Sequence, residues 1–132
     1  MRADLELLHV VRWLVALRRT DPVFRRRRWF QGRAFRGIDV SDLGWFRPDG
    51  SEMTDQDWAA GFAKSLTIVL NGNAIASPDR EGRRVVDDSF LLFVNAHHEP
   101  LEFRAPPPAW GRTWQVELDT ALPSPAPGEL VP

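Results

Sequence analysis

The sequence has 132 residues, of which 43% are hydrophobic and 27% charged, and it contains no cysteine. This length fits one domain, or one domain with an attached element, and excludes an eight-stranded β/α barrel, which needs roughly 200 residues or more. The lack of cysteine excludes disulfides and cysteine metal sites, and the formal net charge of −1 conceals a basic first part and an acidic remainder.

The first predicted element is an amphipathic helix over residues 4–20. Acids near its start and arginines near its end suit the helix dipole, and Pro22 stops this helix or starts a second short turn. A run of four arginines follows at residues 25–28. The apolar side chains recur at the spacing of one helix face: Leu7, Val10, Val11, Leu14 and Leu17.

Beyond residue 29 the pattern changes to short strands separated by turns. Pro48-Asp49-Gly50 is a strong turn signal, and Thr54 with an aspartate three residues later predicts a single helical turn. The predicted strands are "FAKSLTIVL" (62–70), "DSFLLFVNA" (88–96), "LEFRA" (101–105) and "TWQVELD" (113–119). We therefore expect a mainly β fold, an antiparallel β-sandwich preceded by one amphipathic α-helix.

The charge distribution bears on partners and location. Residues 1–36 carry ten arginines against three acids (10 − 3 = +7), and the remainder carries seven basic residues against fifteen acids (7 − 15 = −8). Residues 25–28 could contact nucleic acid, but the acidic strand region favours two parts that lie against each other or against another partner. No apolar run is long enough to span a membrane, and the N-terminus lacks a signal-peptide layout. We expect no nucleic acid, no membrane and a cytoplasmic location.

The residue types that commonly carry chemistry form no convincing site. The histidines at residues 97–98 would point to opposite faces of a strand, so we expect no metal and a solvated hairpin loop there. Glycoside hydrolysis needs two carboxyl groups about 5 Å or about 6.5–9.5 Å apart. Asp55 with Asp57, and Asp87 with Asp88, supply the residue type, but nothing pairs either set with a groove. We expect no cofactor and no catalysis by this chain alone.

Six tryptophans are the strongest remaining lead. A planar aromatic side chain can stack on a sugar ring, so the chain could be a stand-alone carbohydrate-binding module. The competing interpretation is that most of these side chains fill the core, because a tryptophan buries a large apolar area. The candidates for contact with glycogen or maltooligosaccharide are Trp45, Trp58, Trp110 and Trp114.

Four long stretches carry a family resemblance by their order and spacing: "RRRRWFQGR", "GIDVSDLGWFRPDGSEMTDQDW", "LNG" and "DDSFLLFVNAHHEP". Together they resemble the C-terminal part of bacterial glycogen debranching enzymes of the isoamylase type, in the α-amylase superfamily. The resemblance covers about residues 5–120. It implies a longer enzyme in which a catalytic β/α barrel, followed by a β-sandwich, hydrolyses α-1,6 linkages of glycogen or limit dextrin.

The resemblance also divides the chain. Residues 1–28 are similar to the last barrel helix and a basic connector, residues 29–122 to the sandwich, and residues 123–132 form a Pro-rich tail. The three catalytic carboxylates of such enzymes lie upstream, so none is carried over to a position here. The implied partner is the chain's own catalytic barrel. Without that barrel, we expect the helix to pack partly on the sandwich and to expose its remaining face or pair with another copy.

Overall fold

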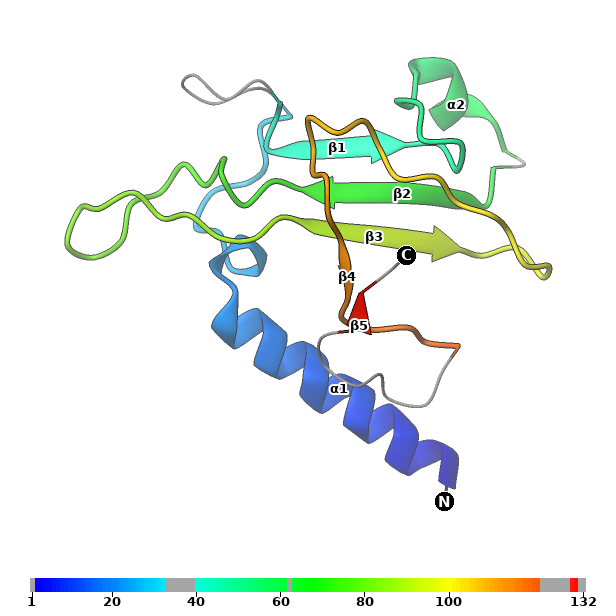
Figure 1. The fold of residues 1–132 in the computed structure, drawn as a ribbon, viewed down its shortest axis with the longest axis horizontal. Coiled ribbons are helices and arrows are strands. Elements are labelled where there is room, and N and C mark those ends of the chain that lie inside the picture. The colour runs from blue at the N-terminus through cyan, green and yellow to red at the C-terminus, as the bar shows by residue number, and fades with distance from the viewer. Residues whose placement is uncertain (1, 33–39, 62, 122–128, 131–132) are drawn as a thin grey trace.

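The computed structural model describes residues 2–32, 40–61, 63–121 and 129–130. The larger sheet has three strands, and Figure 1 shows a long helix that leads away from it and a later segment that crosses it. The elements in chain order are α1 (Arg2–Thr20), the 3-10 helix η1 (Pro22–Phe24), β1 (Leu43–Phe46), α2 (Asp55–Ala59), β2 (Ser65–Leu70), β3 (Phe90–Asn95), β4 (Gln115–Val116) and β5 (Glu129–Leu130).

Both sheets are antiparallel, with strand orders β1-β2-β3 and β4-β5. The predicted mainly β, antiparallel fold with one preceding amphipathic helix is therefore confirmed. In the larger sheet Phe46 lies opposite Thr67, which lies opposite Phe93, so these three side chains share one face. We call it the inner face, because Phe46 and Thr67 are 2% and 0% exposed.

A second layer covers the inner face. The ring of Trp110 lies edge-on to Phe46 with centroids 5.3 Å apart, and Phe103 lies 5.0 Å from Phe93. The segment between these contacts crosses the sheet before β4, as Figure 1 shows. Gly44 permits this close approach, since a Cβ there would lie 2.7 Å from the Trp110 ring. The layering of a sandwich is present, although its second layer is largely irregular.

The strand predicted at residues 101–105 was wrong, and the strand predicted at 113–119 is only two residues long. Arg104 donates its N–H to the carbonyl of Pro48, but residues 106–108 are prolines, which have no N–H to donate to a ladder. The rigid prolines and the aromatic contacts of Phe103 and Trp110 hold the segment against the sheet. The stretch therefore packs on the sheet without extending it.

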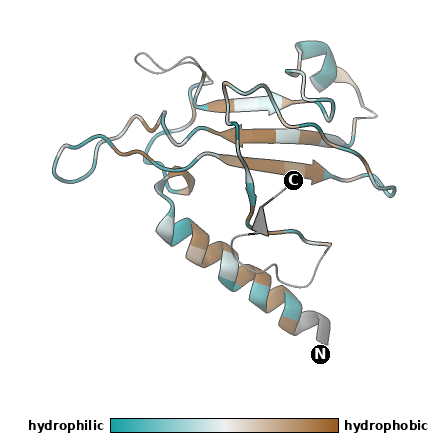
Figure 2. Ribbon diagram, viewed as in Figure 1, coloured by the Kyte–Doolittle hydropathy of each residue, from teal (hydrophilic) through white to brown (hydrophobic). Residues whose placement is uncertain are grey.

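The opposite, outer face of the sheet is apolar and only partly covered. It consists of Leu43, Trp45, Leu66, Ile68, Leu70, Phe90, Leu92 and Val94. Trp58 of α2 lies edge-on to Trp45, with centroids 5.1 Å apart, and Phe24 of η1 lies 4.5 Å from Phe90. Figure 2 shows that most of β2 and β3 is coloured as hydrophobic.

The predicted turn and helix start are both confirmed. Gly50 adopts a φ of +85°, which glycine tolerates, and the N–H of Gly50 donates to the Arg47 carbonyl. The Asp57 carboxylate accepts hydrogen bonds from the backbone N–H and the hydroxyl of Thr54, at 2.7 and 2.9 Å. These bonds fix the start of α2.

The expectation that most tryptophans fill the core was wrong. The buried hydrophobic residues are Val23, Phe46, Val69, Ala74 and Ile75. Four tryptophans are half-buried and two are exposed, Trp58 at 53% and Trp29 at 90%. The layers are thin, so a side chain as large as tryptophan reaches from the core to solvent. Among the described residues, no helix is long and apolar enough to cross a membrane.

Candidate functional site

The helix α1 carries two apolar faces, one half-buried and one exposed. Val10, Trp13 and Leu17 are half-buried at a spacing of three and four residues, so they form the face turned toward the rest of the chain. The exposed apolar face consists of Leu7 (63%), Leu8 (40%), Val11 (47%), Leu14 (45%) and Val15 (45%). The single stripe predicted from the sequence is thus split between two environments.

The exposed face of α1 is unusual for a protein surface. The helix packs chiefly on η1 and extends away from the sheet (Figure 1). A surface helix normally buries one apolar stripe and presents polar residues on the opposite face. On α1 the apolar surface is wider than the stripe that is half-buried here, which is typical of a helix that packs on a second partner. The part of the chain that the structure describes covers only the half-buried stripe.

A buried ion pair joins the basic connector to the sheet. Arg26 lies 3.6 Å from the carboxylate of Asp42, with side chains 7% and 4% exposed. Asp42 also accepts the backbone N–H groups of Gln31 and Gly32 at 2.7 and 2.9 Å, and Arg26 donates to the carbonyl of Ala74 at 2.8 Å. Burial lowers the pKa of Arg26, and the charge of Asp42 opposes that shift. The connector is therefore held firmly against the sheet.

Trp29 follows the connector directly and is 90% exposed. The charge pattern favoured an interface for residues 25–28 as a group, and Trp29 was not among the predicted contact residues. The structure divides that run, since the Arg26 side chain is only 7% exposed whereas the three neighbouring arginines are exposed. The missed signal was Asp42, whose buried carboxylate selects one arginine of the four.

The four tryptophans predicted to contact glucan lie on both sides of the sheet. Trp110 packs over Phe46, and Trp114 is half-buried against Gly111. On the outer face Trp45 is half-buried beneath Trp58. The structure therefore brings together Trp45 and Trp58 only, and of the predicted four Trp58 alone is exposed.

Polar groups flank Trp58. Arg47 forms a two-pronged ion pair with Asp57, at 2.8 and 2.9 Å. The hydrogen bond from Arg47 and then that from the Thr54 backbone lower the pKa of Asp57 to about 2. This carboxylate is therefore ionised, occupied and fixed. Its contacts give it a structural role in positioning α2, which does not suit a catalytic acid.

The second predicted acid pair joins a third carboxylate. Asp21, Asp87 and Asp88 bring carboxylate oxygens within 4.8 Å of one another, beside the start of η1. Burial, and then the charge of Asp87, raises the pKa of Asp21 to about 6. Asp87 also accepts the N–H of Val23 at 3.0 Å. The cluster thus lies at the joint between α1 and the sheet.

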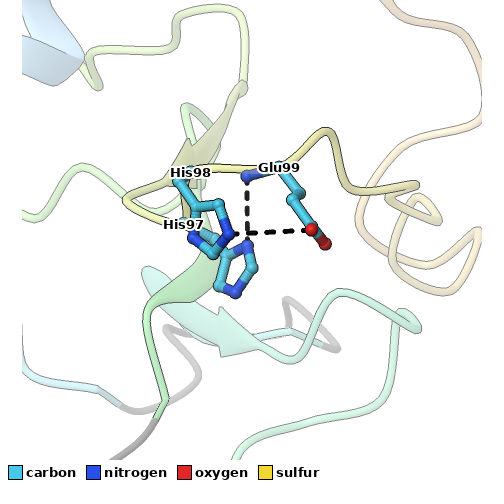
Figure 3. Close-up of side chains that lie close together, drawn as sticks. All are labelled: His97, His98 and Glu99. Carbon is cyan, nitrogen blue, oxygen red and sulfur yellow. Dashed lines mark hydrogen bonds and ion pairs between the residues drawn. The ribbon is translucent and has the colours of Figure 1, made fainter.

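Three exposed side chains follow the end of β3 (Figure 3). His97 and His98 lie past the strand in an exposed loop, as predicted for residues 97–100, and their rings stack with centroids 4.4 Å and planes 27° apart. His98 lies 3.6 Å from the Glu99 carboxylate, and the Glu99 N–H donates to His97 Nδ1 at 3.2 Å. One ligand atom from each of His97, His98 and Glu99 lies within 4.8 Å of the other two.

Comparisons with known proteins now identify the family. Residues 42–130 match the family described as "Isoamylase, C-terminal". The chain is 47% identical over 116 residues to a "Glycogen operon protein GlgX homolog" of Mycobacterium tuberculosis and to one of Mycobacterium bovis, covering 87% of this chain and 16% of each relative. It is 28% identical over 109 residues to a "Glycogen debranching enzyme" of Dickeya chrysanthemi, covering 83% of this chain and 13% of that protein.

The chain thus spans about one sixth of the length of the curated relatives that it matches. The match extends beyond the family domain, because 116 aligned residues within a chain of 132 necessarily include the connector around Trp29. The resemblance drawn from the sequence motifs is confirmed. This chain belongs to the isoamylase C-terminal family.

Proposed function

We propose that this chain is the non-catalytic C-terminal domain of a glycogen debranching enzyme. The longer enzyme would hydrolyse α-1,6-glucosidic branch linkages of glycogen or limit dextrin, with its catalytic carboxylates on a β/α barrel outside this chain. The domain would cover and stabilise that catalytic part. Family membership and the printed names of the relatives support the reaction.

The observation that carries the covering role is the exposed apolar face of α1. Five large aliphatic side chains on one face of α1, each at least 40% exposed, form a surface whose removal from water is favourable. Val10, Trp13 and Leu17 form an adjoining stripe that is already half-buried. A catalytic part that packs on the exposed face would bury α1 between two layers.

The test uses two aspartate substitutions on opposite sides of α1. Leu14→Asp places a carboxylate on the exposed apolar face, and Ala16→Asp places one on the opposite, polar side, where Ala16 is also exposed. Neither change should lower the melting temperature of the 132-residue chain. In the longer enzyme we expect Leu14→Asp to inactivate at least tenfold faster on heating than Ala16→Asp, because a buried unpaired charge is costly. Equal inactivation rates would refute the covering role.

The same substitution tests self-association. If α1 pairs with a second copy, the 132-residue chain sediments as a dimer and Leu14→Asp restores the monomer. A chain that sediments as a monomer while Leu14→Asp still destabilises the longer enzyme assigns the exposed face to the catalytic part.

Glucan contact is a second candidate function, favoured by one observation. Trp58 is 53% exposed, is backed by Trp45, and lies beside the fixed Arg47–Asp57 ion pair. An aromatic face with nearby hydrogen-bonding groups suits a sugar ring. Titration of the chain with maltoheptaose should change tryptophan fluorescence saturably, and Trp58→Ala should abolish the change. A signal without saturation would leave the domain with its covering role alone.

A further inference from the structure

Trp29 is the most exposed of the large hydrophobic side chains that the structure describes, at 90%. Its neighbour in sequence behaves differently, since the Phe30 ring is half-buried and lies beneath Arg26, whose guanidinium carbon is 4.2 Å from the ring centroid. The chain thus buries one aromatic side chain and presents the next to solvent. An exposed indole of this size is unfavourable in water.

The backbone on both sides of Trp29 is fixed. Arg26 precedes it in the buried pair with Asp42, and Gln31 and Gly32 follow it, with their N–H groups bound to the same carboxylate. The side-chain amide of Gln31 also donates to the Trp29 carbonyl at 3.2 Å. Binding of a partner to Trp29 would therefore cost little conformational entropy, because the backbone on both sides is already ordered.

The position of Trp29 in the sequence indicates which partner covers its side chain. It lies outside the family domain of residues 42–130, yet inside the stretch shared with relatives at 47% identity. Those relatives carry 100 − 16 = 84% of their length outside the match. Trp29 thus stands where the family domain meets the remainder of a longer protein. Tryptophan and arginine, the residue types found here, are enriched among the residues that dominate binding between protein surfaces.

We propose that Trp29 is the anchor by which this domain docks on the catalytic part of the longer enzyme, with its indole inserted into a pocket of that part. The inference rests on the proposed function, because it needs a catalytic part in the same polypeptide. It adds a second contact that is separate from the exposed face of α1. The buried Arg26–Asp42 pair positions this anchor.

Hydroxyl-radical footprinting with peptide mass spectrometry measures the exposure of Trp29 directly. We expect its modification rate to be at least tenfold lower in the longer enzyme than in the 132-residue chain. Trp58 serves as the internal control and should react at a similar rate in both. Equal rates for Trp29 in the two proteins would overturn the proposal. Protection of Trp29 only after addition of maltoheptaose would also overturn it and would assign the side chain to glucan binding.

A substitution supplies the second measurement. Trp29→Ala should leave the melting temperature of the 132-residue chain unchanged, because the side chain is 90% exposed there. In the longer enzyme it should raise the rate of proteolytic release of the domain by about 30-fold, the factor that corresponds to roughly 2 kcal/mol for an anchor residue. Val86→Ala removes another exposed apolar side chain and should have no effect on release.

The variants on Trp29 and on α1 separate the two proposals. If Leu14→Asp weakens the longer enzyme and Trp29→Ala does not, the anchor is refuted and the covering role stands. If neither variant has an effect, both fail. A lowered melting temperature of the 132-residue chain with Trp29→Ala would refute the anchor as well, since it would show a role for Trp29 within the domain.

Discussion

The buried pair of Arg26 and Asp42 makes the sharpest prediction about stability. Asp42→Asn keeps the size and shape of the side chain and removes its charge. Asp42 is 3% exposed and accepts two backbone N–H groups, from Gln31 and Gly32. An asparagine can accept one of them through its oxygen, but its NH2 group then faces the other donor. Arg26 is left as a buried cation without its counter-charge.

The expected cost is about 3–5 kcal/mol, the usual penalty for removing one partner of a buried ion pair. The hydrogen bonds alone point to the same size, because bonds to a charged group contribute roughly 1.5–3 kcal/mol each. A domain of this kind has a total stability of about 5–15 kcal/mol. With a urea slope of about 2 kcal/mol/M, the unfolding midpoint should fall by roughly 1.5–2.5 M.

Urea unfolding of the 132-residue chain, followed by tryptophan fluorescence, measures this shift. Asp79→Asn is the matched control, because Asp79 also accepts two backbone N–H groups, from Glu81 and Arg83, and pairs with the Arg83 side chain. Its pair is exposed, so solvent screens it and the shift should be much smaller. If Asp42→Asn lowers the midpoint no more than Asp79→Asn does, burial does not increase the contribution of the Arg26–Asp42 pair to stability, and the reasoning is refuted.

Two further predictions concern the joint between α1 and the sheet. The pKa of Asp21 is raised to about 6 beside Asp87, so the carboxylate favours folding when protonated, and this contribution is lost as pH rises from about 4 to about 6. Asp21→Asn should therefore stabilise the chain at pH 7 by about 1 kcal/mol, after allowance for solvent screening, and by much less at pH 4. Urea unfolding at both pH values measures this gain, with the exposed Glu102→Gln as control. A gain that is independent of pH would contradict the prediction. Gly72→Ala should destabilise by about 1–3 kcal/mol in thermal unfolding, because a Cβ there would collide with the Asp87 carbonyl, whereas Gly61→Ala meets open space; equal effects would contradict the clash.

Local signals in the sequence predicted much of the fold. The turn at Pro48-Asp49-Gly50, the start of α2 at Thr54 and the strand that became β2 each depend on a few neighbouring residues. Such features follow from backbone preferences and side-chain bonds within a few positions, so the pattern was sufficient. The strand predicted at residues 101–105 failed because the stretch leads into three prolines, which have no N–H to donate to a ladder, and the aromatic side chains on either side of the prolines pack on the sheet instead.

The exposed face of α1 and the exposure of Trp29 were harder to predict, because both depend on contacts between residues distant in sequence. Arg26 is distinguished from the neighbouring arginines only by Asp42, sixteen positions later by numbering (42 − 26 = 16). The apolar pattern of α1 showed the helix but not which side chains its own domain would cover. Trp29 was missed for the same reason, since the neighbouring residues in the sequence do not distinguish an exposed tryptophan side chain from a buried one.

The Arg26–Asp42 pair also affects where this domain can be cut. The family match begins at residue 42, so a chain shortened to that boundary would keep the carboxylate and lose its arginine, together with the two backbone N–H groups that the carboxylate binds. It would also lose Val23, which is 1% exposed and belongs to the core. A boundary drawn from sequence similarity would thus remove these partners of the Asp42 carboxylate and leave a cavity where Val23 packs. Soluble expression of this domain should require the connector, even though the connector lies outside the family to which the domain belongs.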